Sequence, residues 1–302
     1  MPITKYPNGV SSFGVPLTGP DYASMFGNYW FVDNSNTSAR NNGKDPSTAF
    51  TTIAAAVAKA AAGDTIYVRG TNTDYDESVT ITANMISLIG VSQHIKMLGW
   101  TADADATCLK IEGHGCVVDG FYFRPEGATT GIAIDIGTDT TTAYGDSTTI
   151  KNCLFKSATT TCAYAIKANG CPEYVKLYNN HFTWCGYGIY VGATALKPAT
   201  AWEIIGNYFS DKCTNGIDMP ARRCLVAGNY FNAMTLHLDL LGYGGTGTFN
   251  SVAGNHFGGD YSTASDSYVA GTSDVWTGNW ATDVGEEEVE VISGATSTVP
   301  AA

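Results

Sequence analysis

The chain has 302 residues and a formal net charge of −12, and only 15% of its residues are charged. This charge argues against a nucleic-acid partner, which needs a basic surface, and against docking on an anionic membrane. No stretch approaches the ~18 continuous apolar residues of a membrane span, and the opening MPITKYPNGV lacks a secretory signal pattern. We therefore expect a protein that accumulates in a cytoplasm, or leaves it by assembly or lysis, and that binds neither nucleic acid nor membrane.

Residues 1–28 are predicted to form an extended N-terminal arm. Pro and Gly interrupt this segment throughout, so neither a helical nor a strand period survives. The segment nevertheless carries aromatic residues, which favour packing on its own body or on a neighbouring subunit: Tyr6, Phe13, Tyr22 and Phe26. A disordered leader is the alternative.

The next part of the chain is predicted to hold four strands and one helix. The strands are expected at 29–32, 64–69, 79–81 and 86–89. The helix is expected at about 49–62, capped by a Ser or Thr and ended by Gly63. Its apolar stripe has the spacing of one buried face: Phe50, Ile53, Ala54, Val57 and Ala61. We expect this helix to plug the N-terminal end of the domain that follows.

From residue 108 onward the sequence repeats itself every 22–32 residues. Each repeat ends in an aromatic residue: Phe123, Phe155, Phe182, Phe209, Phe231, Phe257 and Trp280. Asn stands two places before the aromatic in four repeats and is shifted by one in the last: Asn180, Asn207, Asn229, Asn255 and Asn279. A second apolar series precedes these endings, with one residue of slip allowed: Leu109, Ile134, Ile166, Ile189, Ile217, Leu238 and Val269.

This period predicts a parallel β-helix. No helical periodicity is present, and a propeller blade needs ~40 residues, so each repeat is expected to form one coil. About seven to nine coils would stack at ~4.8 Å, with Phe stacks filling the interior and Asn side chains bonding along a tight corner. We assign 29–282 to this all-β domain and 283–302 to an acidic C-terminal tail, and we expect 284–292 to cover the C-terminal end.

The eight cysteines form no CxxC pair, so neither a zinc site nor a redox motif is expected. Without a secretory signal, buried free thiols are the predicted state.

Two stretches together resemble the pectin-lyase-like family of right-handed parallel β-helices: WFVD…GKDPSTAFTTIAAAVAKAAAGDTIYVRG and the repeat endings GNYF and NNHF. The resemblance covers about residues 29–280 and implies a single-stranded right-handed β-helix. It implies little about function, because the fold carries lyases, hydrolases and non-catalytic virion proteins. The opening MPITKYPNGVSSFG resembles small structural proteins of tailed bacteriophages. That resemblance implies a trimeric virion component whose arm binds another protein.

One candidate catalytic motif is Gly113-His114-Gly115, which matches a tripeptide of polygalacturonase-like hydrolases of this fold. Those enzymes also need Asn-Thr-Asp, Asp-Asp and Arg-Ile-Lys. Here Asn72-Thr73-Asp74 precedes the repeats, and the other two motifs are absent. We therefore interpret the Gly-His-Gly tripeptide as a turn between Ile111 and Val117.

A second candidate follows the lyases of this fold, which use clustered Asp residues for calcium and Arg or Lys as base. Asp218 with Arg222 and Arg223 is the nearest match. Asp239 on the next coil is expected to be one residue out of step with Asp218. A surface ion pair is favoured over catalysis at this corner.

The loop from Asp33 to Asp45 is rich in the oxygen ligands that calcium prefers. Turn formation by Asn, Gly and Asp explains the loop without a metal, and no metal is predicted. His181 and His256 occupy equivalent coil positions where Tyr208 and Tyr230 also stand, which indicates an outward packing position. Further aromatics expected at the surface suit either sugar stacking or a trimer face: Trp184, Tyr187, Tyr190, Trp202 and Tyr208.

We predict a non-catalytic bacteriophage virion protein, a capsid decoration (cement) protein that binds the major capsid protein as a homotrimer without a cofactor. Its partner contacts are expected on the arm residues Tyr6, Phe13, Tyr22 and Phe26. The alternative is a tailspike-like depolymerase, a lyase or glycoside hydrolase, that acts on host surface polysaccharide.

Overall fold

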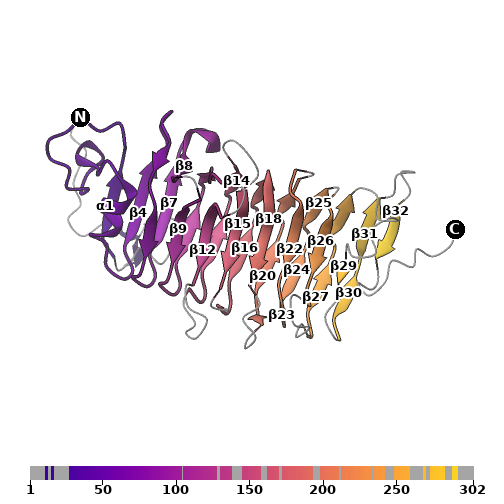
Figure 1. Cartoon of the computed structure of the whole chain (residues 1–302). Coiled ribbons are helices and arrows are strands. Elements are labelled where there is room, and N and C mark those ends of the chain that lie inside the picture. Colours follow the sequence, from indigo (N-terminus) through magenta and orange to yellow (C-terminus); the bar gives the residue numbers. More distant parts are fainter. Residues whose placement is uncertain are drawn as a thin grey trace.

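Three parallel sheets wind around one axis to form a β-solenoid of about seven turns with almost no helix (Figure 1). This computed structural model describes residues 11–12, 15–16, 27–103, 105–127, 130–137, 145–157, 162–169, 172–192, 198–210, 212–232, 234–241, 248–258, 268–269, 273–282 and 288–291. The predicted all-β parallel solenoid is confirmed. None of the helices in this part of the chain is long and apolar enough to cross a membrane.

Each complete turn gives one strand to each sheet. The first sheet contains β3 (Tyr29–Val32), β4 (Thr65–Arg69), β7 (Ser87–Val91), β10 (Val117–Asp119), β13 (Thr149–Lys151), β16 (Lys176–Tyr178), β20 (Glu203–Ile205), β24 (Leu225–Ala227), β27 (Ser251–Ala253) and β30 (Val275–Thr277). The second contains β5 (Tyr75–Asp76), β8 (Gly99–Thr101), β11 (Tyr122–Phe123), β14 (Leu154–Lys156), β17 (His181–Thr183), β21 (Tyr208–Phe209), β25 (Tyr230–Asn232), β28 (His256–Gly258), β31 (Asn279–Thr282) and β32 (Glu288–Val291).

The third sheet contains β6 (Val79–Ile81), β9 (Thr107–Ile111), β12 (Ile132–Ile136), β15 (Cys162–Ala168), β18 (Cys185–Val191), β22 (Asn215–Asp218), β26 (Leu236–Asp239) and β29 (Tyr268–Val269). Two small sheets pair β19 (Ala199–Thr200) with β23 (Ala221–Arg222) and β1 (Ser11–Ser12) with β2 (Val15–Pro16). Two short 3₁₀ helices, η2 (Pro46–Thr48) and η3 (Ile95–Met97), lie in the early turns.

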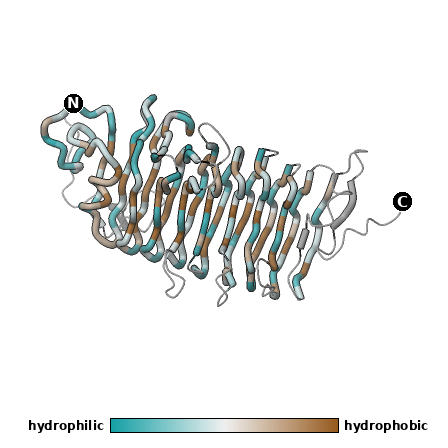
Figure 2. Tube along the Cα trace, viewed as in Figure 1, coloured by the Kyte–Doolittle hydropathy of each residue, from teal (hydrophilic) through white to brown (hydrophobic). Residues whose placement is uncertain are grey.

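The interior is built on stacked phenylalanines. The six predicted Phe residues from Phe123 to Phe257 are register partners on consecutive strands of the second sheet and are fully buried. Their ring centroids lie 4.6 to 5.3 Å apart with nearly parallel planes. The first of them also stacks on Trp100 of the preceding turn at 5.2 Å. Figure 2 shows the resulting hydrophobic bands at the same place in successive turns.

The last member of this series differs from the prediction. Phe257 is paired with Ala281, whereas Trp280 is paired with His256 and is 45% exposed. Trp276, from β30, packs on Phe257 from inside at 6.4 Å. The ring of Trp280 therefore occupies an outward position, although it follows Asn279 as the aromatic end of the repeat.

The asparagines form the predicted ladder at the corner between the first and second sheets. From Asn207 to Asn279, each Oδ1 accepts a hydrogen bond at 2.9 to 3.0 Å from the backbone N–H of the Asn one turn earlier. The Asn180 Oδ1 accepts from the Cys153 N–H at 3.0 Å. All five side chains are buried. Asn279 is thus in register, and the irregularity seen in the sequence belongs to Trp280. The preceding residues adopt left-handed backbone, for example Gly206 at φ 69°, a conformation that glycine adopts without strain.

The apolar series of the third sheet is also confirmed. Six predicted residues are mutual register partners with fully buried side chains: Leu109, Ile134, Ile166, Ile189, Ile217 and Leu238. The partner of Leu238 on the next strand is Tyr268 rather than Val269, within the residue of slip that was allowed.

The helix is shorter than predicted. α1 spans only Ile53–Val57, with Thr52 as its N-cap, and lies at the N-terminal end of the solenoid (Figure 1). Phe50, Ile53 and Ala56 are buried. Ala54 and Ala61 are exposed, contrary to the prediction. Ala54 lies on the face of α1 opposite the buried Ile53 and Ala56, and Ala61 lies beyond the end of the helix. Glu77 accepts hydrogen bonds at 2.7 and 2.8 Å from the backbone N–H groups of Ile53 and Ala54, which fixes the helix start.

At the other end, β32 pairs antiparallel with β31, with Glu290 opposite Trp280. This strand covers the C-terminal edge of the second sheet, as expected for the segment 284–292, of which 288–291 are described.

The cysteines in the described residues are buried free thiols, as predicted: Cys108, Cys116, Cys153, Cys162, Cys185, Cys213 and Cys224. Burial raises the pKa of the Cys116 and Cys224 thiols to about 11 and that of Cys153 to about 12. These groups are therefore protonated and unreactive at neutral pH. Cys171 lies outside the described residues.

Candidate functional site

Two outward surfaces of the solenoid bring chemistry-bearing side chains together. The first is a polar row across the third sheet, with one residue on each of six consecutive strands. We call it the third-sheet row, and its members are register partners: Lys110, Asp135, Lys167, Tyr190, Asp218 and Asp239. Because neighbouring strands lie about 4.8 Å apart, each charged group of the row is next to the groups of the turns before and after it.

Asp218 and Asp239 form a carboxylate pair, which corrects the sequence prediction. They were expected to be one residue out of step, but Ile217 and Leu238 pair without slip, so the two aspartates are direct register partners. Burial, and then the neighbouring charge of Asp239, raise the pKa of Asp218 to about 6. The Asp218 carboxyl can therefore hold a proton up to about pH 6.

The two arginines do not complete this pair. Arg222 and Arg223 are exposed, and none of the ion pairs within the described residues joins either of them to Asp218. The predicted surface ion pair is therefore wrong. The two residue types lie on different sheets. β22 ends at Asp218, whereas Arg222 belongs to β23, which pairs with β19 in a separate small sheet.

Asp135 lies near the other end of the row, in a different environment. It is buried, and this burial raises its pKa to about 6, although the charges of Lys167 and Lys110 on the flanking strands act to lower it. The Lys167 ammonium also lies 5.1 Å from the ring centroid of Tyr164. Asp135 is thus an acid held between two cations, which is typical of a local structural charge cluster.

Three tyrosines gather at the row, and one of them, Tyr190, belongs to it. The rings of Tyr164, Tyr187 and Tyr190 lie 4.9 to 5.3 Å apart. Burial, together with the negative charge of Asp218, raises the pKa of Tyr187 and Tyr190. Retaining glycosidases place two carboxyl groups about 5–5.5 Å apart, close to the strand spacing that separates Asp218 and Asp239. The pair and its aromatic neighbours are therefore one candidate for acid–base chemistry in the described part of the chain.

The carboxylate pair predicts a pH-dependent stability. Because folding raises the pKa of Asp218 above its ordinary value of 3.8, the folded protein holds this proton more tightly than the unfolded chain. The stabilisation is present below about pH 4 and is lost as the pH rises through about 6. Replacing Asp218 with Asn is expected to raise the Tm at pH 7.5 by roughly 2–4 °C.

The measurement is a series of thermal melts of wild type and Asp218→Asn between pH 4 and pH 8. The gain in Tm should shrink toward pH 4, where the wild-type carboxyl is already protonated. Asp103→Asn, at an exposed position, is the control and should leave the pH dependence unchanged. A gain that is equal at pH 4 and pH 8 would contradict this explanation.

The second surface is a row of aromatic rings on the outer face of the second sheet. His181 and His256 are in register with Tyr208 and Tyr230, as predicted, and Trp280 extends the series. We call these five residues the aromatic row. The Tyr208 and Tyr230 rings are 5.2 Å apart and nearly parallel, and the ring of His256 lies 4.7 Å from Tyr230.

A hollow of about 380 Å³ lies at the His181 end of the aromatic row. It is lined by Lys96, Leu154, Lys156, His181, Thr183, Trp184, Tyr208, Ser210 and Lys212. Burial, and then the charge of Lys96, lower the pKa of His181, so this ring is neutral at pH 7. This lysine cluster has no signature in the sequence, because its members are about 60 residues apart and share no motif.

Most of the predicted surface aromatics are at least partly exposed. Trp184 and Tyr208 are exposed, and Tyr187 and Tyr190 are half-buried. Trp202 is fully buried, and its Nε1–H donates to the Pro172 carbonyl at 2.7 Å, so its predicted surface role is wrong. The tight corner at Ala201, with φ of 56°, precedes this inward-pointing ring.

The hydrolase-like motifs do not converge. Gly113-His114-Gly115 lies in a turn between β9 and β10, as predicted. His114 Nδ1 lies 3.5 Å from Asp146 Oδ2, whereas Asp74 of the earlier motif forms an ion pair with Arg124. Each motif thus has its own structural partners, and they do not form one site.

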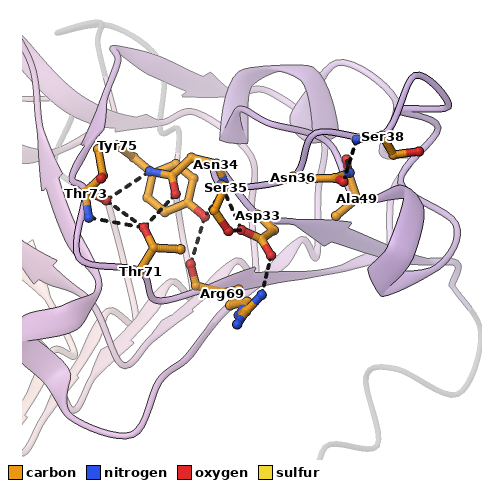
Figure 3. A network of polar contacts seen from close by, with 10 residues as sticks. All are labelled: Asp33, Asn34, Ser35, Asn36, Ser38, Ala49, Arg69, Thr71, Thr73 and Tyr75. Atoms are coloured by element: carbon orange, nitrogen blue, oxygen red, sulfur yellow. Dashed lines mark hydrogen bonds and ion pairs between the residues drawn. The ribbon is translucent and has the colours of Figure 1, made fainter.

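The oxygen-rich loop after β3 is held by its own hydrogen bonds (Figure 3). Asp33 Oδ1 accepts from the N–H and the hydroxyl of Ser35 at 2.9 and 2.6 Å, and Oδ2 accepts from Arg69 at 2.7 Å. Burial acts to raise the pKa of Asp33, but these hydrogen bonds outweigh it and lower the pKa. Asn34 bridges to Thr71 and to the Thr73 carbonyl. The loop therefore fastens the first turn, consistent with turn formation.

No group of three or more His, Cys, Asp or Glu residues in the described parts of the chain is arranged to hold a metal ion. The predicted partner contacts of the arm, Tyr6, Phe13, Tyr22 and Phe26, lie outside the described residues.

Comparisons with known proteins add only distant likenesses. No family model and no curated protein matches the chain. An alginate lyase of the PL6 family, AlyGC, is 15% identical with a TM-score of 0.45, over 76% of this chain and 37% of the lyase. The pectin methylesterase PemA from Erwinia chrysanthemi is 10% identical with a TM-score of 0.38, over 88% and 86% of the two chains. The ORF18 protein of Geobacillus virus E2 is 11% identical with a TM-score of 0.33, over 73% and 53%.

The chain spans little more than a third of the length of the alginate lyase. At these identities the likeness concerns the solenoid fold alone.

Proposed function

We propose that the protein is a non-catalytic structural protein of a bacteriophage virion, a capsid decoration protein that binds the capsid surface as a homotrimer. The virion assignment rests on the resemblance of MPITKYPNGVSSFG to small structural proteins of tailed phages. The binding function is supported by the aromatic row of the second sheet, which is the observation that carries the proposal.

The row has the properties of a protein-binding surface. Tyr208, Tyr230 and Trp280 are 37–45% exposed although they are large and partly apolar. Their strands are held in register on both sides, so little conformational entropy is lost when a partner covers the rings. Tyr and Trp are the residue types that most often dominate binding energy at interfaces. A contiguous exposed aromatic surface on a rigid scaffold therefore favours binding to another protein.

The proposed binding is tested on phage particles. The chain should be found at fixed stoichiometry in purified virions, and the isolated protein should have the mass of a trimer. Rebinding to particles from a phage that lacks this chain should weaken about tenfold or more for a Tyr208→Ala/Tyr230→Ala variant. Tyr174→Ala is the control, because Tyr174 is 53% exposed but lies outside the row.

Two results would contradict the proposal. One is the absence of the chain from intact virions. The other is equal rebinding by wild type and the double Tyr variant.

A second candidate function, a depolymerase of host surface polysaccharide, is favoured by one observation, the Asp218–Asp239 pair beside three tyrosines. If the pair is catalytic, incubation with host glycan, alginate or pectate will give new reducing ends or unsaturated uronates. Asp218→Asn and Asp239→Asn will each abolish the product, whereas Asp103→Asn will not. The absence of product from every glycan tested would exclude this candidate.

A further inference from the structure

Three lysines from three different turns converge on the hollow at the end of the aromatic row. Lys96 belongs to η3, Lys156 ends β14 and Lys212 follows β21. The nine described lining residues include no Asp or Glu. Neither Lys96 nor Lys156 belongs to any ion pair within the described residues. The hollow is therefore a local concentration of positive charge.

This charge contrasts with the rest of the chain. Lys and Arg number 16 against 28 Asp and Glu, so the surface as a whole repels acidic partners. The lysine hollow is a place on this surface where an acidic partner is favoured. Charge complementarity of this kind fixes orientation and speeds association.

The hollow also offers non-ionic contacts. Trp184 is 43% exposed, and Tyr208 belongs both to the hollow and to the aromatic row. The hydroxyls of Ser210 and Thr183 lie 2.9 Å apart on the same wall. A ligand that suits all of these groups carries carboxylates for the lysines and an apolar or aromatic part for the rings.

We propose that the lysine hollow docks an acidic, aromatic-containing segment of the protein to which this chain binds. The inference rests on the proposed binding function and names the surface and chemistry of that contact. We choose a protein segment as the ligand because the hollow adjoins the aromatic row, which continues over three further turns beyond Tyr208. A ligand seated in the hollow and a partner lying on the row are then parts of one molecule.

The test reverses charge at the hollow. Lys96→Glu/Lys156→Glu is compared with Arg40→Glu/Lys59→Glu, which changes the net charge equally at two exposed positions elsewhere on the surface. Rebinding to particles that lack this chain should weaken about tenfold or more for the hollow variant and less than about twofold for the control. Wild-type rebinding should also weaken as salt concentration rises. Unchanged melting temperatures will show that both variants fold.

A second measurement separates this inference from the proposed function. A fluorescently labelled peptide of alternating Glu and Tyr is titrated with the isolated protein, and anisotropy should report binding to wild type and its loss in the hollow variant. If wild type binds neither virions nor particles, the proposed function fails, while the peptide still tests the hollow.

Three results would overturn the inference. The first is equal binding by wild type and the hollow variant. The second is displacement of the peptide by oligogalacturonate at lower concentration than by unlabelled peptide, which would identify an acidic sugar as the occupant. The third is dissociation of the trimer in the hollow variant, which would identify a second copy.

Discussion

Replacing Asn207 with Ala is expected to lower the free energy of unfolding by about 3–4 kcal/mol. The Asn207 Oδ1 accepts hydrogen bonds from the backbone and side-chain N–H groups of Asn180 at 2.9 and 3.1 Å. Its Nδ2 donates to the Leu177 carbonyl at 2.9 Å and to Asn229 Oδ1 at 3.0 Å. The alanine variant removes the acceptor of the Asn180 backbone N–H and the side-chain donor to the Leu177 carbonyl, whereas Asn229 Oδ1 keeps the Asn207 backbone N–H at 2.9 Å. Each buried group left unsatisfied costs about 1–3 kcal/mol.

The measurement is chemical denaturation of both proteins at pH 7. Asn215→Ala is the matched control, because Asn215 is half-buried on β22. Its replacement should change the free energy of unfolding by less than about 0.5 kcal/mol. Similar losses at both positions would show that the ladder makes no special contribution to stability.

The repeat architecture was predictable because one residue type performs the same task in every turn. In the middle turns a stacked Phe packs on another Phe in register, and a corner Asn bonds to another Asn. These contacts put identical residues at nearly constant intervals in the sequence, as at Phe182 and Phe209 or Asn180 and Asn207. The spacing of the repeats therefore predicts which residues pair between neighbouring strands in the middle turns.

The chain ends and the surface were harder to predict. At Trp280 the aromatic side chain is compatible with an inward or an outward position, and only the hydrogen bond from Asn255 to Asn279 settles the register. The Ala-rich segment after Ile53 favours a long helix by propensity. The chain instead turns into β4, where Asp64 accepts a hydrogen bond from the Ala61 N–H.

The two candidate surfaces depend on register rather than on motif. Asp218 and Asp239 become neighbours only when their strands pair without slip, and a single residue of slip would separate them. Lys96 and Lys156 are 60 residues apart in the sequence, and no spacing rule joins them before the turns are stacked. Which residues become neighbours in such clusters depends on the lengths of all the loops between them.

Adjacent residues on β21 provide the sharpest test of which face is structural and which is functional. Phe209 is fully buried and stacks between Phe182 and Phe231, at 4.6 and 4.7 Å. Phe209→Ala should lower the free energy of unfolding by about 3–5 kcal/mol, because the core loses apolar area and retains a cavity. Tyr208→Ala, one residue earlier and facing outward, should cost no more than about 1 kcal/mol through the lost ring contact with Tyr230.

Phe209→Ala should have the larger effect on stability, and Tyr208→Ala the larger effect on particle rebinding, measured at a temperature where both variants are folded. Phe209→Ala keeps the aromatic row and should rebind like wild type, whereas Tyr208→Ala should bind more weakly. Because the two side chains leave one strand in opposite directions, a local distortion of β21 would affect both measurements in both variants. Separate effects on stability and on binding would therefore assign the Phe stack to folding and the aromatic row to recognition, and parallel effects would refute that division.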